Sequence, residues 1–387
     1  MTANAFIASA QRWATLLMIT VLVAPTVAWS ISPTPAPPAI GARSYLLIDH
    51  NSGKILAEKN ADEVIEPASI TKLMTAYVVF QELASGHVKL SDMVTVSEKA
   101  WRTPGSRMFI EVGKKVSVED LLKGMIIQSG NDASVALAEH VAGAEETFAS
   151  LMNQYAQQLG MSQTTYENST GLPGDRHRST ARDIGLLTRA IIREFPQYYG
   201  WYSERDFTFN GITQANRNKL LLRDESVDGV KTGHTDAAGY CLVSSAKRGA
   251  MRLIAVVMGT NSPKVRADAS QAMLNYGFQF YESYQVYSAG ERIEDWRVWK
   301  GDTETVGFGA AQDVFVTIPR GRREAVSAVR DMRRTVLAPV AEGEALGTLR
   351  VLLDEDLIFE TPLIAVESVA EGNLWRRAVD QVTLWFE

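Results

Sequence analysis

Cysteine is nearly absent from this chain, since Cys241 is the only one among 387 residues. No intramolecular disulfide can form, so the hydrophobic core must supply the stability of the fold alone. The surrounding run, GYCLVSSA, is apolar and strand-like, and it predicts that Cys241 is a small buried side chain rather than a reactive thiol. At 46% hydrophobic and 22% charged residues, the composition is that of a globular protein with room for two domains.

An excess of positive charge is missing too. The chain has 39 Lys and Arg residues against 45 Asp and Glu residues, a formal net charge of −6. This balance gives no reason to expect binding to nucleic acid. Residues 320–334 are rich in arginine, and we interpret them as a solvated surface, with a polyanion or lipid headgroup site as the alternative.

Acidic residues are absent from the N-terminal segment, where none precedes Asp49. Arg12 comes before the apolar stretch WATLLMITVLV, and small residues end at Ala28. This pattern predicts a secretory signal at 1–28, with an uncleaved N-terminal anchor as the alternative. The Pro-rich segment 29–41 predicts a flexible leader, so the rest of the chain is expected to work outside the cytoplasm.

Histidine is scarce, and this limits which side chains could act as the base that activates a nucleophile. Five histidines occur, and none lies in a serine-protease or G-x-S-x-G motif. The segment PASITKLM at 67–74 offers another base, because Ser69 and Lys72 stand three residues apart at a predicted helix start and share a face. A lysine is a base at neutral pH only where burial or a second cation disfavours its charged form. The pair therefore predicts a dry site with another positive charge nearby.

Two further motifs follow in order. Ser-Gly-Asn occupies 129–131 and Lys-Thr-Gly occupies 231–233, and each occurs once. S-x-x-K alone is weak, and Ser244 to Lys247 is a second match that its mid-strand context marks as structural. Ser69 instead begins a helix, where free N–H groups favour developing negative charge. In this order the motifs form the S-x-x-K, S-x-N, K-T-G constellation of penicillin-binding proteins and serine β-lactamases.

The hydrophobic pattern predicts an α+β fold for 42–281. Two strands joined by a turn are predicted within 42–60, and three more strands within 227–260. Between them, most of 67–84 and 118–195 repeats apolar residues at helical spacing, and 264–283 is helix-like. Strands on both sides of a helical section predict one sheet closed by distant segments, with helices on its faces.

The pattern changes after residue 281. Short β runs separated by Gly, Pro and acidic turns predict a small all-β domain at 282–370. Residues 371–387 predict an amphipathic helix with two tryptophans and Phe386 on one face and arginines on the other. Such a helix suits the plane of a membrane interface, and docking on its own domain is the alternative.

Longer segments carry a resemblance beyond the three motifs. They include YLLIDHNSGKILAEKNAD, EPASITKLMTAYVVF, IIQSGNDASVALAE, FTFNGITQANRN and VDGVKTGHTDAAGY. Together they resemble the low-molecular-mass D-alanyl-D-alanine carboxypeptidases of the penicillin-binding protein 5 and 6 type, over essentially the whole mature chain. The resemblance implies a β-lactamase/transpeptidase-like sheet covered by helices, then a small all-β domain. It also implies an enzyme without cofactor or metal at the periplasmic face of the inner membrane, attached to the membrane surface by its C-terminal helix.

The resemblance also implies roles. Ser69 would attack the peptide bond between the last two D-alanines of a peptidoglycan pentapeptide, and Lys72 would take its proton. Ser129 would relay a proton to the leaving D-alanine, and Lys231 would hold that hydroxyl and keep Lys72 neutral. Asn131 would bond the substrate carbonyl or the lysine. β-Lactams would acylate Ser69 as covalent inhibitors.

The remaining candidates concern substrate recognition. Under the same resemblance, the backbone N–H groups of Ser69 and His234 would form an oxyanion hole. Thr232, Thr235 and Arg266 are candidates for the terminal carboxylate, and Gly233 offers a place where a substrate strand could approach the backbone.

Three alternative functions remain open on the sequence. A class A β-lactamase would need a glutamate for deacylation, and Glu167 stands near the corresponding distance after Ser129, but no asparagine follows it four residues later, so we interpret Glu167 as a turn residue. An endopeptidase acting on cross-links would carry identical motifs. A non-catalytic wall-binding protein is the third alternative, and the presence of all the catalytic positions argues against it. The loop AWRTPGSRMFIEVG is shorter than its counterpart in better-known family members, which affects substrate access.

Overall fold

The structure is a computed structural model that describes residues 34–386. The predicted export signal at 1–28 and the first residues of the leader lie outside the described residues. Residues 34–41 form neither helix nor strand, as their Pro-rich composition predicts.

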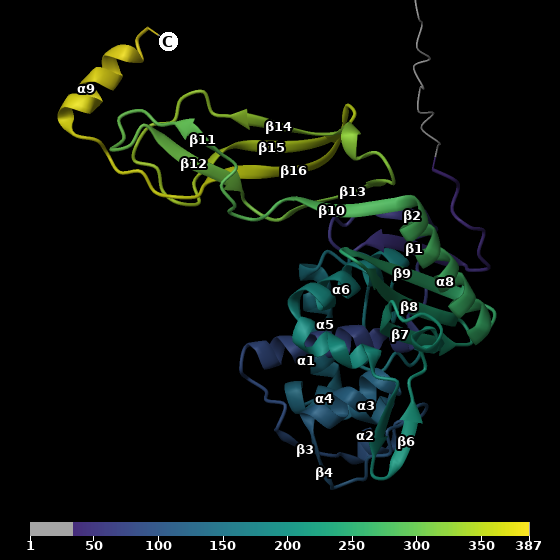
Figure 1. Cartoon of the computed structure of the whole chain (residues 1–387). Coiled ribbons are helices and arrows are strands. Elements are labelled where there is room, and N and C mark those ends of the chain that lie inside the picture. The colour runs from purple at the N-terminus through teal and green to yellow at the C-terminus, as the bar shows by residue number, and fades with distance from the viewer. Residues whose placement is uncertain (1–33, 387) are drawn as a thin grey trace, which may run out of the picture. The chain divides into compact units, whose positions relative to one another are not determined.

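A five-stranded antiparallel sheet organises the first domain, with strand order β2-β1-β9-β8-β7 (Figure 1). The strands are β1 (Ser44–Asp49), β2 (Ile55–Lys59), β7 (Val227–Thr235), β8 (Gly239–Arg248) and β9 (Met251–Thr260). The N-terminal hairpin thus pairs with strands from the far side of the helical section. The predicted closure of one sheet by distant segments is confirmed.

The two faces of this sheet are covered by different helices. Side chains of a strand alternate between faces, so Leu46 and Ile48 join the core under the helical section, whereas Leu47 packs on the side of α8 (Pro263–Phe280). Cys241 is fully buried, as predicted. The helix predicted for 264–283 ends at Phe280, because residues 281–283 already belong to the next strand, β10 (Tyr281–Tyr287).

The helical section lies between β2 and β7. Its helices are α1 (Lys72–Ala84), α2 (Glu98–Arg102), α3 (Val118–Ile127), α4 (Asn131–Ala142), α5 (Glu145–Gln158), α6 (Ala181–Glu194) and α7 (Pro196–Tyr199), with 3-10 turns η1 (Ala68–Thr71), η2 (Gly200–Ser203) and η3 (Lys219–Leu222). Two small two-stranded antiparallel sheets, β3–β4 (Met93–Thr95, Lys115–Ser117) and β5–β6 (Asp206–Phe209, Ile212–Ala215), interrupt it. Helix α1 is buried along most of its length, which suits a central helix.

The second domain is all-β, as predicted. A five-stranded antiparallel sheet has the order β11-β12-β16-β15-β14, and β10 pairs with β13. The elements are β10 (Tyr281–Tyr287), β11 (Glu294–Arg297), β12 (Thr305–Ala310), β13 (Val314–Pro319), η4 (Arg323–Ala325), β14 (Val326–Met332), β15 (Ala345–Leu353) and β16 (Asp356–Ala365). Its buried residues are mostly aliphatic, with Phe308 and Trp299 as buried aromatics, and Phe308, Leu349 and Leu363 are almost fully buried.

The last helix, α9 (Leu374–Thr383), is shorter than the predicted amphipathic segment. The side chain of Asn373 accepts a hydrogen bond from the N–H of Arg376 and so caps the first turn. Asp380 and Gln381 bond to the backbone N–H and the ammonium of Lys300, which ties the polar face of α9 to the β domain. Among the helices of residues 34–386, none has the length and apolar character that crossing a bilayer requires.

Candidate active site

Ser69 lies on η1, three residues before α1 begins at Lys72. Ala68 next to it has φ 48°, a left-handed conformation that a residue with a Cβ adopts at a cost of roughly 1 kcal/mol or more. Such strain persists only where surrounding structure enforces it, and it concentrates at functional sites. Ser69 is half-buried, whereas Lys72 is 1% exposed. The hydroxyl can be approached while the amine stays dry.

The ammonium nitrogen of Lys72 has three acceptors. Its Nζ lies 3.1 Å from Ser69 Oγ, 2.6 Å from Asn131 Oδ1 and 2.5 Å from the carbonyl oxygen of Thr170. Residues 69 and 131 come from two predicted motifs, which the fold brings together through the packing of α1 on α4. The carbonyl of Thr170 carries no sequence signal, since any residue type presents the same group.

The environment lowers the basicity of Lys72, and the cation that contributes to this is Arg217 rather than Lys231, the residue that the resemblance implied. Burial, and after it the charge of Arg217, lower the pKa of Lys72 to about 7, while Asp132 and Glu145 act in the opposite direction. A lysine with a pKa near 7 is partly neutral at physiological pH and can accept the proton of a nearby hydroxyl.

The second motif supplies another hydroxyl and amine pair. Ser129, in the turn between α3 and α4, has φ 71° and is 2% exposed. Lys231, on β7, donates to Ser129 Oγ over 2.9 Å and is 3% exposed. Burial lowers the pKa of Lys231 well below its usual range, and the charges of Lys72 and Arg217 lower it further.

A steric contact explains why glycine occupies position 233, and this explanation differs from the predicted one. A Cβ at this position would lie 3.0 Å from the carbonyl oxygen of Pro67 and 3.2 Å from Cβ of Ala68. Strand β7 therefore runs directly against η1, and a side chain at position 233 would require the neighbouring backbone to shift. The neighbour on that side of the backbone is the protein itself rather than a substrate strand, and the contact sets Lys231 beside the Ser69 turn.

The other predicted recognition residues have these placements. Thr232 is 5% exposed, and His234 is exposed with its ring stacked on Tyr240 at 4.0 Å between centroids. Thr235 Oγ1 donates to Glu66 over 2.9 Å. Arg266, on α8, donates to the carbonyl oxygens of Gly233 and Cys241 at 3.1 and 3.3 Å, so its guanidinium holds main-chain atoms of β7 and β8.

Two charged residues of the site were missed from the sequence. Arg217 is exposed, donates to the carbonyl oxygen of Gln128 over 3.0 Å and lowers the pKa of both lysines. Asp132 is 1% exposed and accepts hydrogen bonds from the N–H groups of residues 108, 109, 110 and 133. Asp132 directly follows the Ser-Gly-Asn motif, which was its only available signal.

Comparison with known proteins agrees with this geometry. The family model described as D-alanyl-D-alanine carboxypeptidase matches residues 31–262, and the one described as penicillin-binding protein 5, C-terminal domain, matches 281–371. The D-alanyl-D-alanine carboxypeptidase DacC of Escherichia coli strain K12 is 45% identical over 373 residues, 94% of this chain and 93% of that protein.

Solved structures of penicillin-binding proteins are also similar to this chain. Penicillin-binding protein 5 from Haemophilus influenzae is 43% identical, with a TM-score of 0.82 over 87% of this chain and 100% of that one. The ampicillin-bound form of penicillin-binding protein D2 from Listeria monocytogenes is 30% identical, with a TM-score of 0.59 over 63% of this chain and 100% of that one. The chain therefore belongs to the D-alanyl-D-alanine carboxypeptidase family, a family of serine peptidases.

Proposed function

We propose that this D-Ala-D-Ala carboxypeptidase works through an acyl-enzyme on Ser69, with Lys72 as the base that activates it. The observation that carries the proposal is the 3.1 Å contact between Lys72 Nζ and Ser69 Oγ, together with the burial that lowers the pKa of that lysine to about 7. Ser69 Oγ forms a bond to the carbonyl carbon between the last two D-alanines, and Lys72 takes the hydroxyl proton.

The second pair serves the leaving group. Collapse of the tetrahedral intermediate breaks the C–N bond, and the departing amine of D-alanine needs a proton. Ser129 is the proposed relay, because Lys231 holds its hydroxyl at 2.9 Å and both side chains are buried. Water then hydrolyses the ester on Ser69, which releases the shortened peptide and restores the hydroxyl.

Charge that develops on the substrate needs its own partners. The backbone N–H groups of Ser69 and His234 are the proposed oxyanion hole, a contribution of about 3 kcal/mol per donor. For the terminal carboxylate we propose Thr232, Thr235 and Arg217. Arg217 is exposed and close enough to lower the pKa of both lysines, whereas the Nη1 of Arg266 is already bonded to main-chain carbonyls.

A labelled penicillin tests the nucleophile directly. A β-lactam presents a strained amide to the same serine, so we expect one covalent adduct per chain, located on Ser69 by peptide mass spectrometry. Ser69→Ala should abolish the adduct and the release of D-alanine from a pentapeptide while its circular dichroism stays unchanged. An adduct that persists in Ser69→Ala would contradict the proposal.

The same preparation separates the alternatives of this family. Release of D-alanine from a pentapeptide that exceeds both the cleavage of a cross-linked dimer and the turnover of penicillin is the expected result. Fast penicillin turnover would favour a β-lactamase. The placement of Glu167 speaks against that activity, because its carboxylate accepts hydrogen bonds from Arg176 in a turn.

We also propose that the enzyme is exported and that α9 rests on the periplasmic surface of the inner membrane. The apolar face of this segment is uncovered, since Leu374, Trp375 and Phe386 are 82%, 79% and 85% exposed. Binding to vesicles containing anionic lipid should be lost in Trp375→Glu/Trp385→Glu, with acylation by penicillin unchanged. Equal flotation of the double variant with such vesicles would exclude this surface role.

A further inference from the structure

We propose that Glu145 is a positioning residue for Lys72, because its carboxylate joins the loop carrying Thr170 to helix α2 through an ion pair with Lys99. This inference rests on the proposed role of Lys72 as the base. Glu145 does not touch Ser69 or Lys72 in the described contacts, so its effect is exerted through the groups to which Lys72 donates.

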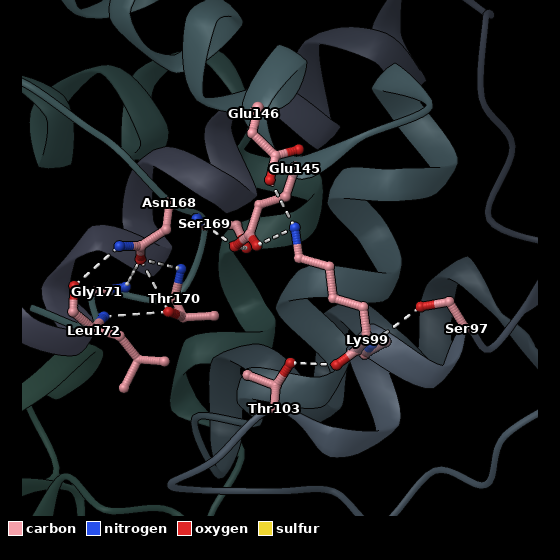
Figure 2. Close-up of polar contacts among 11 residues, drawn as sticks. Ser97, Lys99, Thr103, Glu145, Glu146, Asn168, Ser169, Thr170, Gly171 and Leu172 are labelled. Atoms are coloured by element: carbon pink, nitrogen blue, oxygen red, sulfur yellow. Dashed lines mark hydrogen bonds and ion pairs between the residues drawn. The ribbon is translucent and has the colours of Figure 1, made fainter. Parts of the chain in front are cut away.

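The loop 168–172 supplies one of those groups. The carbonyl oxygen of Thr170 accepts from Lys72 Nζ over 2.5 Å. Asn168 Oδ1 accepts from the N–H groups of Thr170 and Gly171 at 3.1 and 2.8 Å, which gives the loop a tight turn (Figure 2). A Cβ on Gly171, where φ is +85°, would fall 1.8 Å from the carbonyl oxygen of Ala68. The loop therefore lies against the backbone that precedes the nucleophile.

Glu145 holds the start of this loop. Its Oε1 accepts from the N–H and the hydroxyl of Ser169 at 3.0 and 2.7 Å, and its Oε2 lies 3.1 Å from Lys99 Nζ (Figure 2). The carbonyl oxygen of Ser169 accepts from Thr75 on α1 over 2.6 Å, so Ser169 is fixed on two sides. Glu145 is 9% exposed, whereas the neighbouring Glu146, which reaches the same Lys99 at 2.9 Å, has a side chain 78% exposed.

Lys99 connects this carboxylate to the second acceptor of the base. It lies on α2, and the segment that follows α2 presents the carbonyl oxygen of Pro104 to Asn131 Nδ2 over 2.6 Å. The other end of that amide, Asn131 Oδ1, accepts from Lys72 Nζ over 2.6 Å. The Lys99–Glu145 pair thus lies between the two segments that place the acceptors of Lys72.

The same carboxylate also acts on Lys72 through its charge. Glu145 favours the protonated amine, against burial and Arg217, which favour the neutral one. The charged and titratable groups around Lys72 come from five further elements or loops. They are Asp132 on α4, Glu145 on α5, His177 before α6, Arg217 after β6 and Lys231 on β7.

The test is the pH dependence of the second-order rate at which a fluorescent penicillin acylates Ser69, measured from pH 5 to 9. Glu145→Gln keeps an oxygen for Ser169 but removes the charge, so the acid limb should move to lower pH with the maximal rate within about threefold of wild type. Lys99→Met removes the positive charge that offsets the carboxylate of Glu145, so the acid limb should move to higher pH. Glu145→Ala also loses the anchor, and its maximal rate should fall about tenfold or more.

Glu146→Gln is the matched control, because it removes a neighbouring carboxylate that pairs with the same lysine but does not touch the loop. Its profile should superimpose on that of wild type. Opposite shifts in Glu145→Gln and Lys99→Met support the inference, even where Glu145→Ala fails to fold. Unshifted profiles in both, or a shift of Glu145→Gln to higher pH, overturn it. An acid limb that survives in Lys72→Met would instead refute the proposed role of Lys72, which keeps the two failures distinct.

Discussion

The two domains handle charge in opposite ways. The first domain buries Lys72, Lys231, Asp132 and Arg266, each 9% exposed or less. Among the described residues from 282 to 386, no Lys, Arg, Asp or Glu side chain is buried, and the ion pairs of that domain lie at its surface. Burying a charge without full compensation costs several kcal/mol, so buried charged groups keep hydrogen-bond partners, also away from the proposed site, as Asp49 and Asp183 do.

The backbone shows the same difference. Two non-glycine residues with left-handed φ lie at the proposed catalytic hydroxyl groups: Ala68, which precedes Ser69, and Ser129. In the β domain such residues, Lys300 and Asp354, lie outside the strands. In the first domain Asn60, Phe109 and Asn210 also have left-handed φ, so two of its five such residues lie at the proposed reactive groups.

Loss of the base should produce the largest effect. Lys72→Met removes the amine and keeps an apolar side chain of similar length, so acylation by penicillin should fall by about 10³-fold. Stopped-flow fluorescence measures the rate, and circular dichroism checks the fold. A fall of less than about tenfold would contradict a general-base role for Lys72.

Substituting one aspartate in each domain compares how much a buried and an exposed carboxylate contribute to stability. Asp132→Ala leaves several buried N–H groups without an acceptor and should destabilise the first domain by about 3 kcal/mol or more. Asp331→Ala removes a carboxylate that is 69% exposed and 3.4 Å from Arg350, so it should change stability by less than about 0.5 kcal/mol. Urea unfolding followed by near-ultraviolet circular dichroism gives both values. Equal effects would remove the distinction between the domains.

The pH dependence of stability should also differ. The pKa of Lys72 is about 7 in the folded chain and 10.5 in the unfolded one, so the unfolded state binds more protons between these values. The free energy of unfolding of the first domain should therefore rise with pH from about 7.5 to 9.5, by about 1.4 kcal/mol per pH unit from this group. The rise should shrink by that amount in Lys72→Met and persist in Ser69→Ala. An identical slope in Lys72→Met would show that this lysine keeps an ordinary pKa.

Much of the fold could be predicted from the sequence because its signals are local. The hairpin around Asn51 and the strand that carries Lys231 follow from alternation and turn residues, and both are present. The end of α9 at Thr383 was missed, because apolar periodicity continues through Trp385 and Phe386, whose N–H groups make i→i−3 turn bonds instead of α-helical ones.

The site was predictable to the extent that it consists of motifs. Lys72 donates to Ser69 and Asn131, and Lys231 donates to Ser129, so residues of the three motifs are in contact. The contribution of Glu145 was not predictable, because it depends on contacts across 24 residues to Ser169 and 46 residues (145 − 99) to Lys99 that no local pattern encodes. Arg217 likewise depends on where the segment after β6 folds, which hydrophobic periodicity does not determine.

A measurement of the pKa of Lys72 tests most directly whether this residue can act as the base. Nuclear magnetic resonance of a protein with isotope-labelled lysine, assigned with Lys72→Met, would follow the side-chain signal as pH changes. A Lys72 base predicts a midpoint near 7, with the neutral amine present at physiological pH beside Ser69. A midpoint near 10.5, the ordinary value for lysine, would contradict it.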